Sequence, residues 1–141
     1  MKVLLASDGS PNALRAAQWV IALSSEMKTP ISVCLTSVHD DAPYRKAMRH
    51  VGRADVMDLL RTQSEEDVAE VKAELLKAGV TVECKLEVGE IAETLVNIAQ
   101  REQCSLIVMG QKGRSTVANL LMGSIATRVL ALAQVPVTLV R

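Results

Sequence analysis

Short apolar segments alternate along this chain with longer stretches in which apolar residues recur every three or four positions. The short segments are typical of strands, and we expect strands at residues 3–6, 31–38, 82–88, 106–109 and 137–140. The longer stretches indicate amphipathic helices. Strands that alternate with helices predict an α/β fold, in which a five-stranded parallel sheet carries helices on both of its faces.

Turn-forming residues mark the ends of several predicted helices. Ser10-Pro11 is typical of a helix start, and Gly79 of a helix end. Gly89 precedes another helical stripe, whereas residues 39–56 show the weakest pattern in the chain. The length of 141 residues, with no internal repeat and no low-complexity linker, predicts one domain at residues 1–141.

Two of the predicted strands end in residues suited to binding a ligand. The first strand is followed by Ser7-Asp8, and the fourth by Gly110. In a doubly wound parallel sheet, ligands bind beyond the carboxyl ends of the strands, where the winding direction reverses. If these two strands are neighbours at that point, both loops face one crevice.

The loop after the fourth strand has three glycines at fixed spacing. It reads Gly110-Gln111-Lys112-Gly113, then nine residues, then Gly123-Ser124 at the start of a helix. Glycine lets the backbone approach a ligand and adopt positive φ, and the amides at a helix start point toward an anion. We therefore expect a phosphate-binding loop. The alternative is a flexible loop followed by an ordinary helix cap, with Ser124 as the N-cap.

The glycine spacing differs from the P-loop and from the dinucleotide fingerprint. It is similar to the nucleotide-binding signature of the universal stress protein family, in its ATP-binding branch. Residues 2–10, 106–110 and 135–140 resemble the same family, so the resemblance covers nearly the whole chain. It implies a Rossmann-like fold related to the adenine nucleotide alpha hydrolases, ATP accompanied by Mg²⁺ as the ligand, and a homodimer through the C-terminal strand.

The resemblance also implies a set of nucleotide-binding residues: Ala6, Ser7, Asp8, Val38, Met109, Gly110, Gln111, Gly113, Arg114, Ser115, Gly123, Ser124, Ile125 and Ala126. A carboxylate repels a triphosphate but accepts hydrogen bonds from ribose or adenine, so we expect Asp8 to face the adenosine. Its alternative role is an Asx turn before Gly9. Lys112 and Arg114 flank Gly113 and would neutralise phosphate charge, or else are solvated loop charges.

Composition excludes several other kinds of function. The 16 basic and 16 acidic side chains cancel, and Trp19 and Tyr44 are the only aromatic residues, so we expect no nucleic-acid partner. No apolar run reaches the roughly 20 residues of a membrane span. The three cysteines are widely spaced, which is typical of a reduced intracellular protein, and the two histidines lack neighbouring metal ligands. We expect a cytoplasmic protein without a membrane or metal site.

No catalytic residue stands out. His39 follows the second strand and is a weak candidate for a base, because no nucleophile with a placed partner is evident. The acidic residues 65–67 are expected on a solvated helix face. The sequence thus predicts at most a slow ATPase that acts as a nucleotide-dependent stress sensor or regulator. The alternative is a dimeric stress-response adaptor that does not use nucleotide, and the downstream partner is not readable in either case.

The C-terminal strand is expected at an edge of the sheet. Residues 137–140 are β-prone and uncharged, whereas the strand at residues 82–88 alternates apolar with charged residues and suits the other, protected edge. An unprotected edge favours pairing with another chain. A two-fold contact between copies of this strand therefore agrees with the dimer that the resemblance implies.

Overall fold

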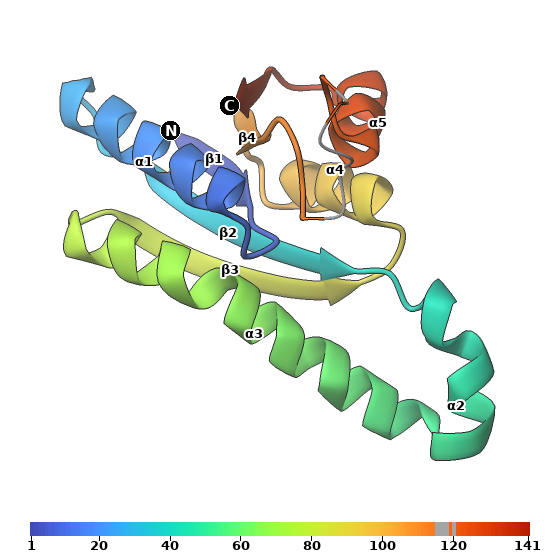
Figure 1. The fold of residues 1–141 in the computed structure, drawn as a ribbon. Helices are drawn as coiled ribbons and strands as arrows, with labels where there is room; N and C mark the ends of the chain where they lie inside the picture. The colour runs from blue at the N-terminus through green and yellow to red at the C-terminus, as the bar shows by residue number, and fades with distance from the viewer. Residues whose placement is uncertain (115–118, 120) are drawn as a thin grey trace.

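The five strands form one parallel sheet in the order β3-β2-β1-β4-β5, as a computed structural model of residues 1–114, 119 and 121–141 shows (Figure 1). The strands are β1 (Lys2–Ala6), β2 (Ser32–His39), β3 (Thr81–Val88), β4 (Leu106–Gly110) and β5 (Val137–Val140). The predicted α/β fold with a five-stranded parallel sheet is confirmed. The predicted edges are also confirmed, because β3 and β5 are the outer strands.

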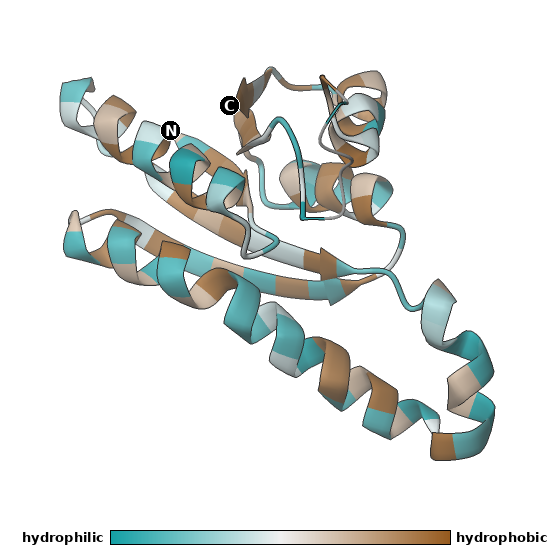
Figure 2. Ribbon diagram, viewed as in Figure 1, coloured by the Kyte–Doolittle hydropathy of each residue, from teal (hydrophilic) through white to brown (hydrophobic). Residues whose placement is uncertain are grey.

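Helices cover both faces of the sheet. One layer consists of α1 (Pro11–Glu26) and α3 (Arg53–Lys77), and the other of α4 (Ile91–Arg101) and α5 (Ser124–Leu132). Alternate residues of β1 enter the two cores: Val3 and Leu5 face the α1–α3 layer, and Leu4 faces the other. Figure 2 shows apolar residues along the inner strands. A strand buried on both faces is therefore apolar at every position.

Two predicted helix ends are confirmed. The Ser10 hydroxyl accepts the backbone N–H of Ala13 at 3.3 Å and so caps α1, with Pro11 as its first residue. Gly79, with φ of +76°, follows α3 in the left-handed conformation that glycine adopts most easily.

Residues 39–56 have more regular structure than the sequence indicated. They contain a 3₁₀ turn, η1 (Ala42–Tyr44), the short helix α2 (Arg45–Val51) and the first residues of α3. The buried face of α3 runs from Val56 through Leu60 to Leu75, but two of its positions are Ser64 and Asp67. Because these residues are polar, the apolar stripe seen in the sequence began only after them.

The winding reverses between β1 and β4, which are hydrogen-bonded neighbours. The loop after β1 and the loop after β4 therefore meet at one edge of the sheet, as predicted. Among the described residues, no helix combines the length and the apolar composition needed to cross a membrane.

Candidate functional site

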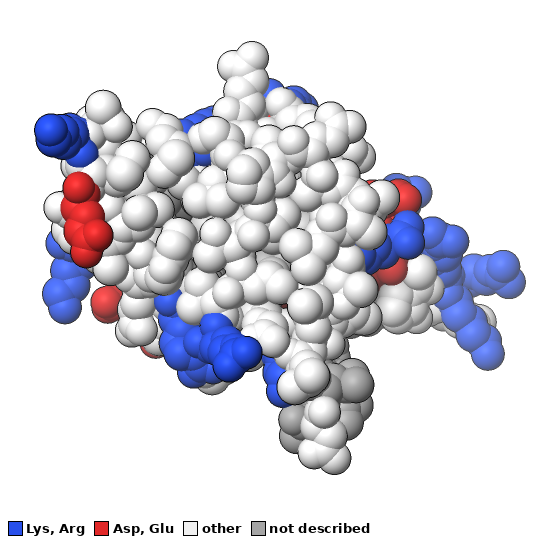
Figure 3. Space-filling view, turned by 90° about the horizontal axis from the view of Figure 1, so that it is seen from above, with Lys and Arg blue, Asp and Glu red and all other residues white. Residues whose placement is uncertain are grey.

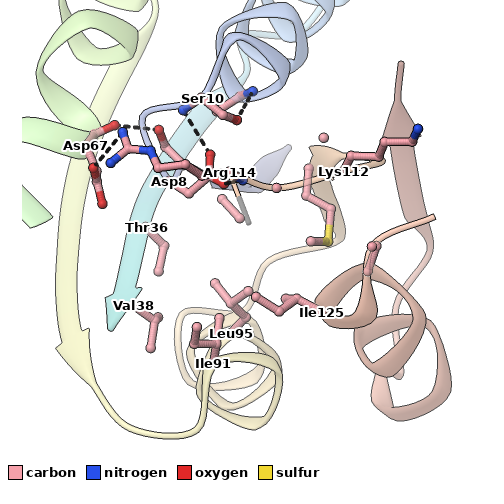
Figure 4. Close-up of a pocket in the computed structure, with 18 of the residues that line it drawn as sticks. Asp8, Ser10, Thr36, Val38, Asp67, Ile91, Leu95, Lys112, Arg114 and Ile125 are labelled. Carbon is pink, nitrogen blue, oxygen red and sulfur yellow. Dashed lines mark hydrogen bonds and ion pairs between the residues drawn. The ribbon is translucent and has the colours of Figure 1, made fainter. Parts of the chain in front are cut away.

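A cavity of about 320 Å³ lies at the carboxyl edge of the sheet, where the loops after β1, β2 and β4 meet the starts of α4 and α5 (Figure 4). This volume lies within the range of small-ligand sites. One part of its wall is apolar and consists of Val38, Ile91, Leu95, Met109, Ile125 and Ala126. The opposite end carries Asp8, Ser10, Asp67 and Arg114, as Figure 4 shows.

The cavity brings together nearly all of the residues that the sequence singled out. Its wall contains Ala6, Ser7, Asp8, Val38, Met109, Gly110, Gly113, Arg114, Gly123, Ser124, Ile125 and Ala126. Ser115 lies outside the described residues. Gln111 does not line the cavity but holds the loop backbone. Its N–H donates to the Val140 carbonyl at 2.7 Å, and its carbonyl accepts the N–H of Gly123 at 2.9 Å.

Asp8 joins two loops through backbone hydrogen bonds. Its Oδ1 accepts the N–H of Ser10 at 3.0 Å, which is the Asx turn expected before Gly9. Its Oδ2 accepts the N–H of Arg114 at 2.8 Å. The carboxylate therefore holds the glycine loop against the loop after β1, and it stands in the cavity wall as well.

The glycines of the loop serve close approach rather than positive φ. Among the described glycines, positive φ occurs at Gly9, Gly52 and Gly79, outside the loop. A Cβ at Gly110 would lie 2.7 Å from the Cβ of Asn12, so this strand end packs directly on the start of α1. A Cβ at Gly113 would lie 3.0 Å from Asp8 Oδ2. A side chain at Gly113 would crowd Asp8 in the cavity wall, and one at Gly110 would collide with the start of α1.

The N-terminus of α5 borders the cavity. Gly123, with φ of −71° and ψ of 153°, is the N-cap, and no side chain caps the helix. The interpretation of Ser124 as the N-cap is therefore wrong, because Ser124 is the first helical residue. The first bond within the helix runs from the Thr127 N–H to the Gly123 carbonyl at 3.0 Å. The amides of residues 124–126 have no acceptor within α5, and all three residues line the cavity.

Asp67 is a cavity residue that the sequence assigned to a solvated helix face, and that assignment is wrong. Its side chain is only 6% exposed. Its Oδ2 lies 2.9 Å from His39 Nε2, and its Oδ1 lies 3.4 Å from a terminal nitrogen of Arg114. The Ser7 hydroxyl donates to its backbone carbonyl at 2.6 Å. The one sequence signal that could have found it is the spacing along α3, because Asp67 lies seven positions after Leu60 and four before Val71, on the buried face of the helix.

His39 and Lys112 also line the cavity. The His39 ring is turned toward Asp67 on α3 by the contact just described. The Lys112 carbonyl accepts a hydrogen bond from the Asn12 side chain at 2.8 Å, which fixes the loop backbone on α1. These contacts hold the cavity wall in place, and among the described residues they do not pair His39 with a nucleophile.

Known proteins match this chain along its whole length. The model of the universal stress protein family matches residues 1–141. A universal stress protein of Thermus aquaticus is 34% identical over 141 residues, covering 99% of this chain and 97% of that protein. The solved structure of MJ0577 from Methanocaldococcus jannaschii is 26% identical with a TM-score of 0.85, covering 99% of this chain and 94% of that one.

A universal stress protein from Archaeoglobus fulgidus, solved in complex with dAMP, has a TM-score of 0.68 and covers 100% of this chain and 98% of its own. At 21% identity, this likeness concerns the fold.

Proposed function

The chain belongs to the universal stress protein family, and on that premise we propose that it binds ATP in the cavity at the carboxyl edge of its sheet. Residues 1–141 would act as one nucleotide-binding domain and as a cytoplasmic stress sensor or regulator. The observation that carries the proposal is the cavity itself, in which an apolar wall lies between the N-terminus of α5 and the Asp8 carboxylate.

The phosphates fit the end of the cavity formed by the glycine loop and α5. The amides at a helix N-terminus bind anions because they lack acceptors and because the helix dipole is positive there. Gly113 and Gly123 add no side chains to this part of the wall, so a phosphate chain can approach the backbone. Lys112, in the same wall, supplies a positive charge.

The nucleoside fits between the Asp8 carboxylate and the apolar part of the cavity wall. A carboxylate there repels phosphate but accepts hydrogen bonds from ribose hydroxyls or an adenine amino group. Val38, Ile91 and Leu95 offer aliphatic contacts to a base, in a chain that has very few aromatic residues. The family protein that was solved with dAMP holds a ligand of this chemical class.

Mg²⁺ would accompany the triphosphate. Asp8 and Asp67 are the carboxylates in the described wall of the cavity, and both already accept hydrogen bonds or ion pairs from protein groups. We therefore expect phosphate oxygens and water to hold the ion, as is usual for Mg²⁺. Hydrolysis would be slow at most, since among the described residues His39, the candidate base, is turned toward Asp67.

The experiment is to denature the purified protein, identify released small molecules by mass spectrometry, and titrate the ligand-free protein with ATP by calorimetry. We expect an adenine nucleotide in the supernatant or saturable heat with ATP. If neither is found, the protein is better described as a dimeric adaptor that does not use nucleotide. Titration with adenosine and with GTP gives the matched controls for the phosphate and base parts of the site.

A homodimer through β5 completes the proposal. The strand is an uncharged edge from Val137 to Val140. The face in Figure 3 shows a broad uncharged surface with charged side chains mainly at its rim. Leu130 and Leu132 of α5 are also partly exposed, at 45% and 38%.

A further inference from the structure

Arg114 is held at two points in the described structure. Its backbone N–H donates to Asp8. Its guanidinium group extends to Asp67 on α3, where a terminal nitrogen lies 3.4 Å from Oδ1 (Figure 4). The side chain thus connects the glycine loop to a helix in the layer that packs on the other face of the sheet from α5.

The absence of a side chain at Gly9 leaves space for this ion pair. The pair passes over Gly9, which has φ of +74°. A Cβ at Gly9 would lie 2.5 Å from the same terminal nitrogen of Arg114 and 2.9 Å from Asp67 Oδ1. A side chain at Gly9 would therefore occupy the space in which the two groups meet.

The two partners differ in how firmly they are placed. Asp67 is 6% exposed and is fixed on α3 by His39 as well, whereas the Arg114 side chain is 65% exposed. An ion pair with one solvated partner is weak. Arg114 is thus the partner that can move.

The ion pair also stands between two cavities. A smaller cavity of about 100 Å³ between α1 and α3 shares Ser10, Asp67 and Arg114 with the proposed nucleotide site. If the guanidinium group left Asp67, it would remain beside the larger cavity, because its backbone is bound to Asp8 in that wall.

We propose that Asp67 competes with the phosphates of the nucleotide for Arg114: it holds the guanidinium group while the site is empty and releases it when a phosphorylated ligand binds. This inference rests on the proposed function. A phosphate can accept two parallel hydrogen bonds from a guanidinium group, which makes it a stronger partner than a carboxylate oxygen at 3.4 Å. Adenosine offers no such acceptor and leaves the pair intact, so α3 is uncoupled from the glycine loop only by ligands that carry phosphate.

The test is a double-mutant cycle measured by calorimetry, with ATP and adenosine as ligands and with the unmodified protein, Asp67→Asn, Arg114→Gln and the double variant. Asparagine retains an acceptor for His39 and removes the charge that holds Arg114. We expect Asp67→Asn to tighten ATP binding by about two- to fivefold, the range of a weak surface ion pair. Adenosine affinity should change far less, and the gain with ATP should disappear when residue 114 is glutamine.

Several outcomes would overturn the inference. An equal gain from Asp67→Asn with and without Arg114 would show simple repulsion between Asp67 and the phosphates. Unchanged or weaker ATP binding in Asp67→Asn would show that Asp67 does not compete. If the unmodified protein does not bind ATP, the proposed function fails together with the inference; if it binds ATP with no coupling between the two residues, only the inference fails.

A second variant decides the matter if Asp67→Asn does not fold. Arg114 is mostly exposed, so Arg114→Gln should keep the fold, as circular dichroism can verify. Its loss of affinity should be larger for ATP than for AMP and small for adenosine. Equal losses for all three ligands would place the guanidinium group on the nucleoside and contradict the exchange.

Discussion

The Asp8 carboxylate accepts the backbone N–H of Arg114 at 2.8 Å, although the two residues stand 106 positions apart in the chain. This hydrogen bond joins the loop after β1 to the glycine loop after β4 directly across the point where the winding reverses. A residue expected to recognise the nucleoside thus also fixes the backbone that is proposed to hold the phosphates.

Replacing Asp8 with alanine should weaken ATP and adenosine binding alike, each by about tenfold or more. A hydrogen bond to a charged acceptor contributes roughly 1.5–3 kcal/mol, and a loss of 1.4 kcal/mol is a factor of ten in affinity. Calorimetric titration of both ligands is the measurement. Asp8→Asn is the matched control, since it retains one oxygen acceptor and should lose less.

A loss confined to ATP in Asp8→Ala would contradict the placement of Asp8 at the nucleoside. It would indicate instead that the carboxylate acts on the triphosphate through a metal ion. Thermal unfolding of the ligand-free variants separates this result from a general loosening of the two loops.

Valine at Gly123 should block the phosphates without distorting the backbone. The φ of −71° and ψ of 153° at this residue are open to any side chain, so the fold should persist. We expect ATP affinity to fall by about tenfold or more, because the amides of α5 would be shielded from the phosphate chain. Adenosine binding should change much less.

Gly113→Val offers a comparison at a second point of the same loop. Its Cβ would stand 3.0 Å from Asp8 Oδ2, so this variant should weaken adenosine binding as well as ATP binding. Equal ATP affinity in the unmodified protein and in both valine variants would rule out the assigned phosphate site.

Much of this site was predictable because parallel strands end at one edge of a sheet. Ser7-Asp8 and Gly110 end two apolar segments, and the topology makes those strands neighbours. Asp67 was not predictable in the same way. An acidic residue beside Glu65 and Glu66 is typical of a solvated helix face, and Asp67 is buried only because α3 packs beside β2, where His39 and Arg114 meet it.

The direction of the Arg114 side chain was equally hidden. The motif placed a cation next to Gly113, but the sequence contains nothing that selects Asp67 over a phosphate as its partner in the ligand-free protein. The motif suggested glycine both for close approach and for positive φ, and the sequence could not show that Gly110 and Gly113 serve only close packing, against Asn12 and Asp8.

A group of four charges should make stability depend on pH at both extremes. Lys2 Nζ lies 3.0 Å from Glu102 and 3.4 Å from Glu83, and Lys85 Nζ lies 2.6 Å from Glu83 and 3.2 Å from Glu102. The hydrogen bond from Lys2 lowers the pKa of Glu102 below its usual 4.5, and that from Lys85 does the same for Glu83. The carboxylates in turn raise the pKa of both lysines above 10.5.

The direction of the change in stability can be worked out separately for low and for high pH. A lowered carboxyl pKa stabilises the fold above the unfolded value near 4.5, and this stability is lost as the pH falls through the folded pKa. A raised lysine pKa stabilises the fold below the unfolded value near 10.5. This stability is lost as the pH rises through the pKa of the folded protein. Thermal unfolding from pH 3 to 11 should show both losses.

Glu102→Gln should reduce the loss of stability at both low and high pH, because Glu102 pairs with both lysines. The matched control is Glu65→Gln, at a mostly exposed residue whose pair with Arg61 is 3.8 Å long. If the two variants have the same pH profile, the four-charge group does not contribute to the pH dependence of stability.

Proline at Leu139 should convert the proposed dimer to a monomer. The Val140 carbonyl accepts the Gln111 N–H, so the backbone of residue 140 faces β4. The N–H and C=O groups of successive residues in a strand point to opposite sides. Those of residue 139 therefore face the free edge, where a second copy of β5 would pair. Proline removes an N–H from that edge and is tolerated on edge strands.

Thr138→Pro is the control. The N–H of Thr138 faces β4, so its loss should lower the thermal stability of the monomer. Light scattering at micromolar concentration should show a dimer for the unmodified protein and a folded monomer for Leu139→Pro. A folded dimer in Leu139→Pro, or a monomer for the unmodified protein, would exclude assembly through β5.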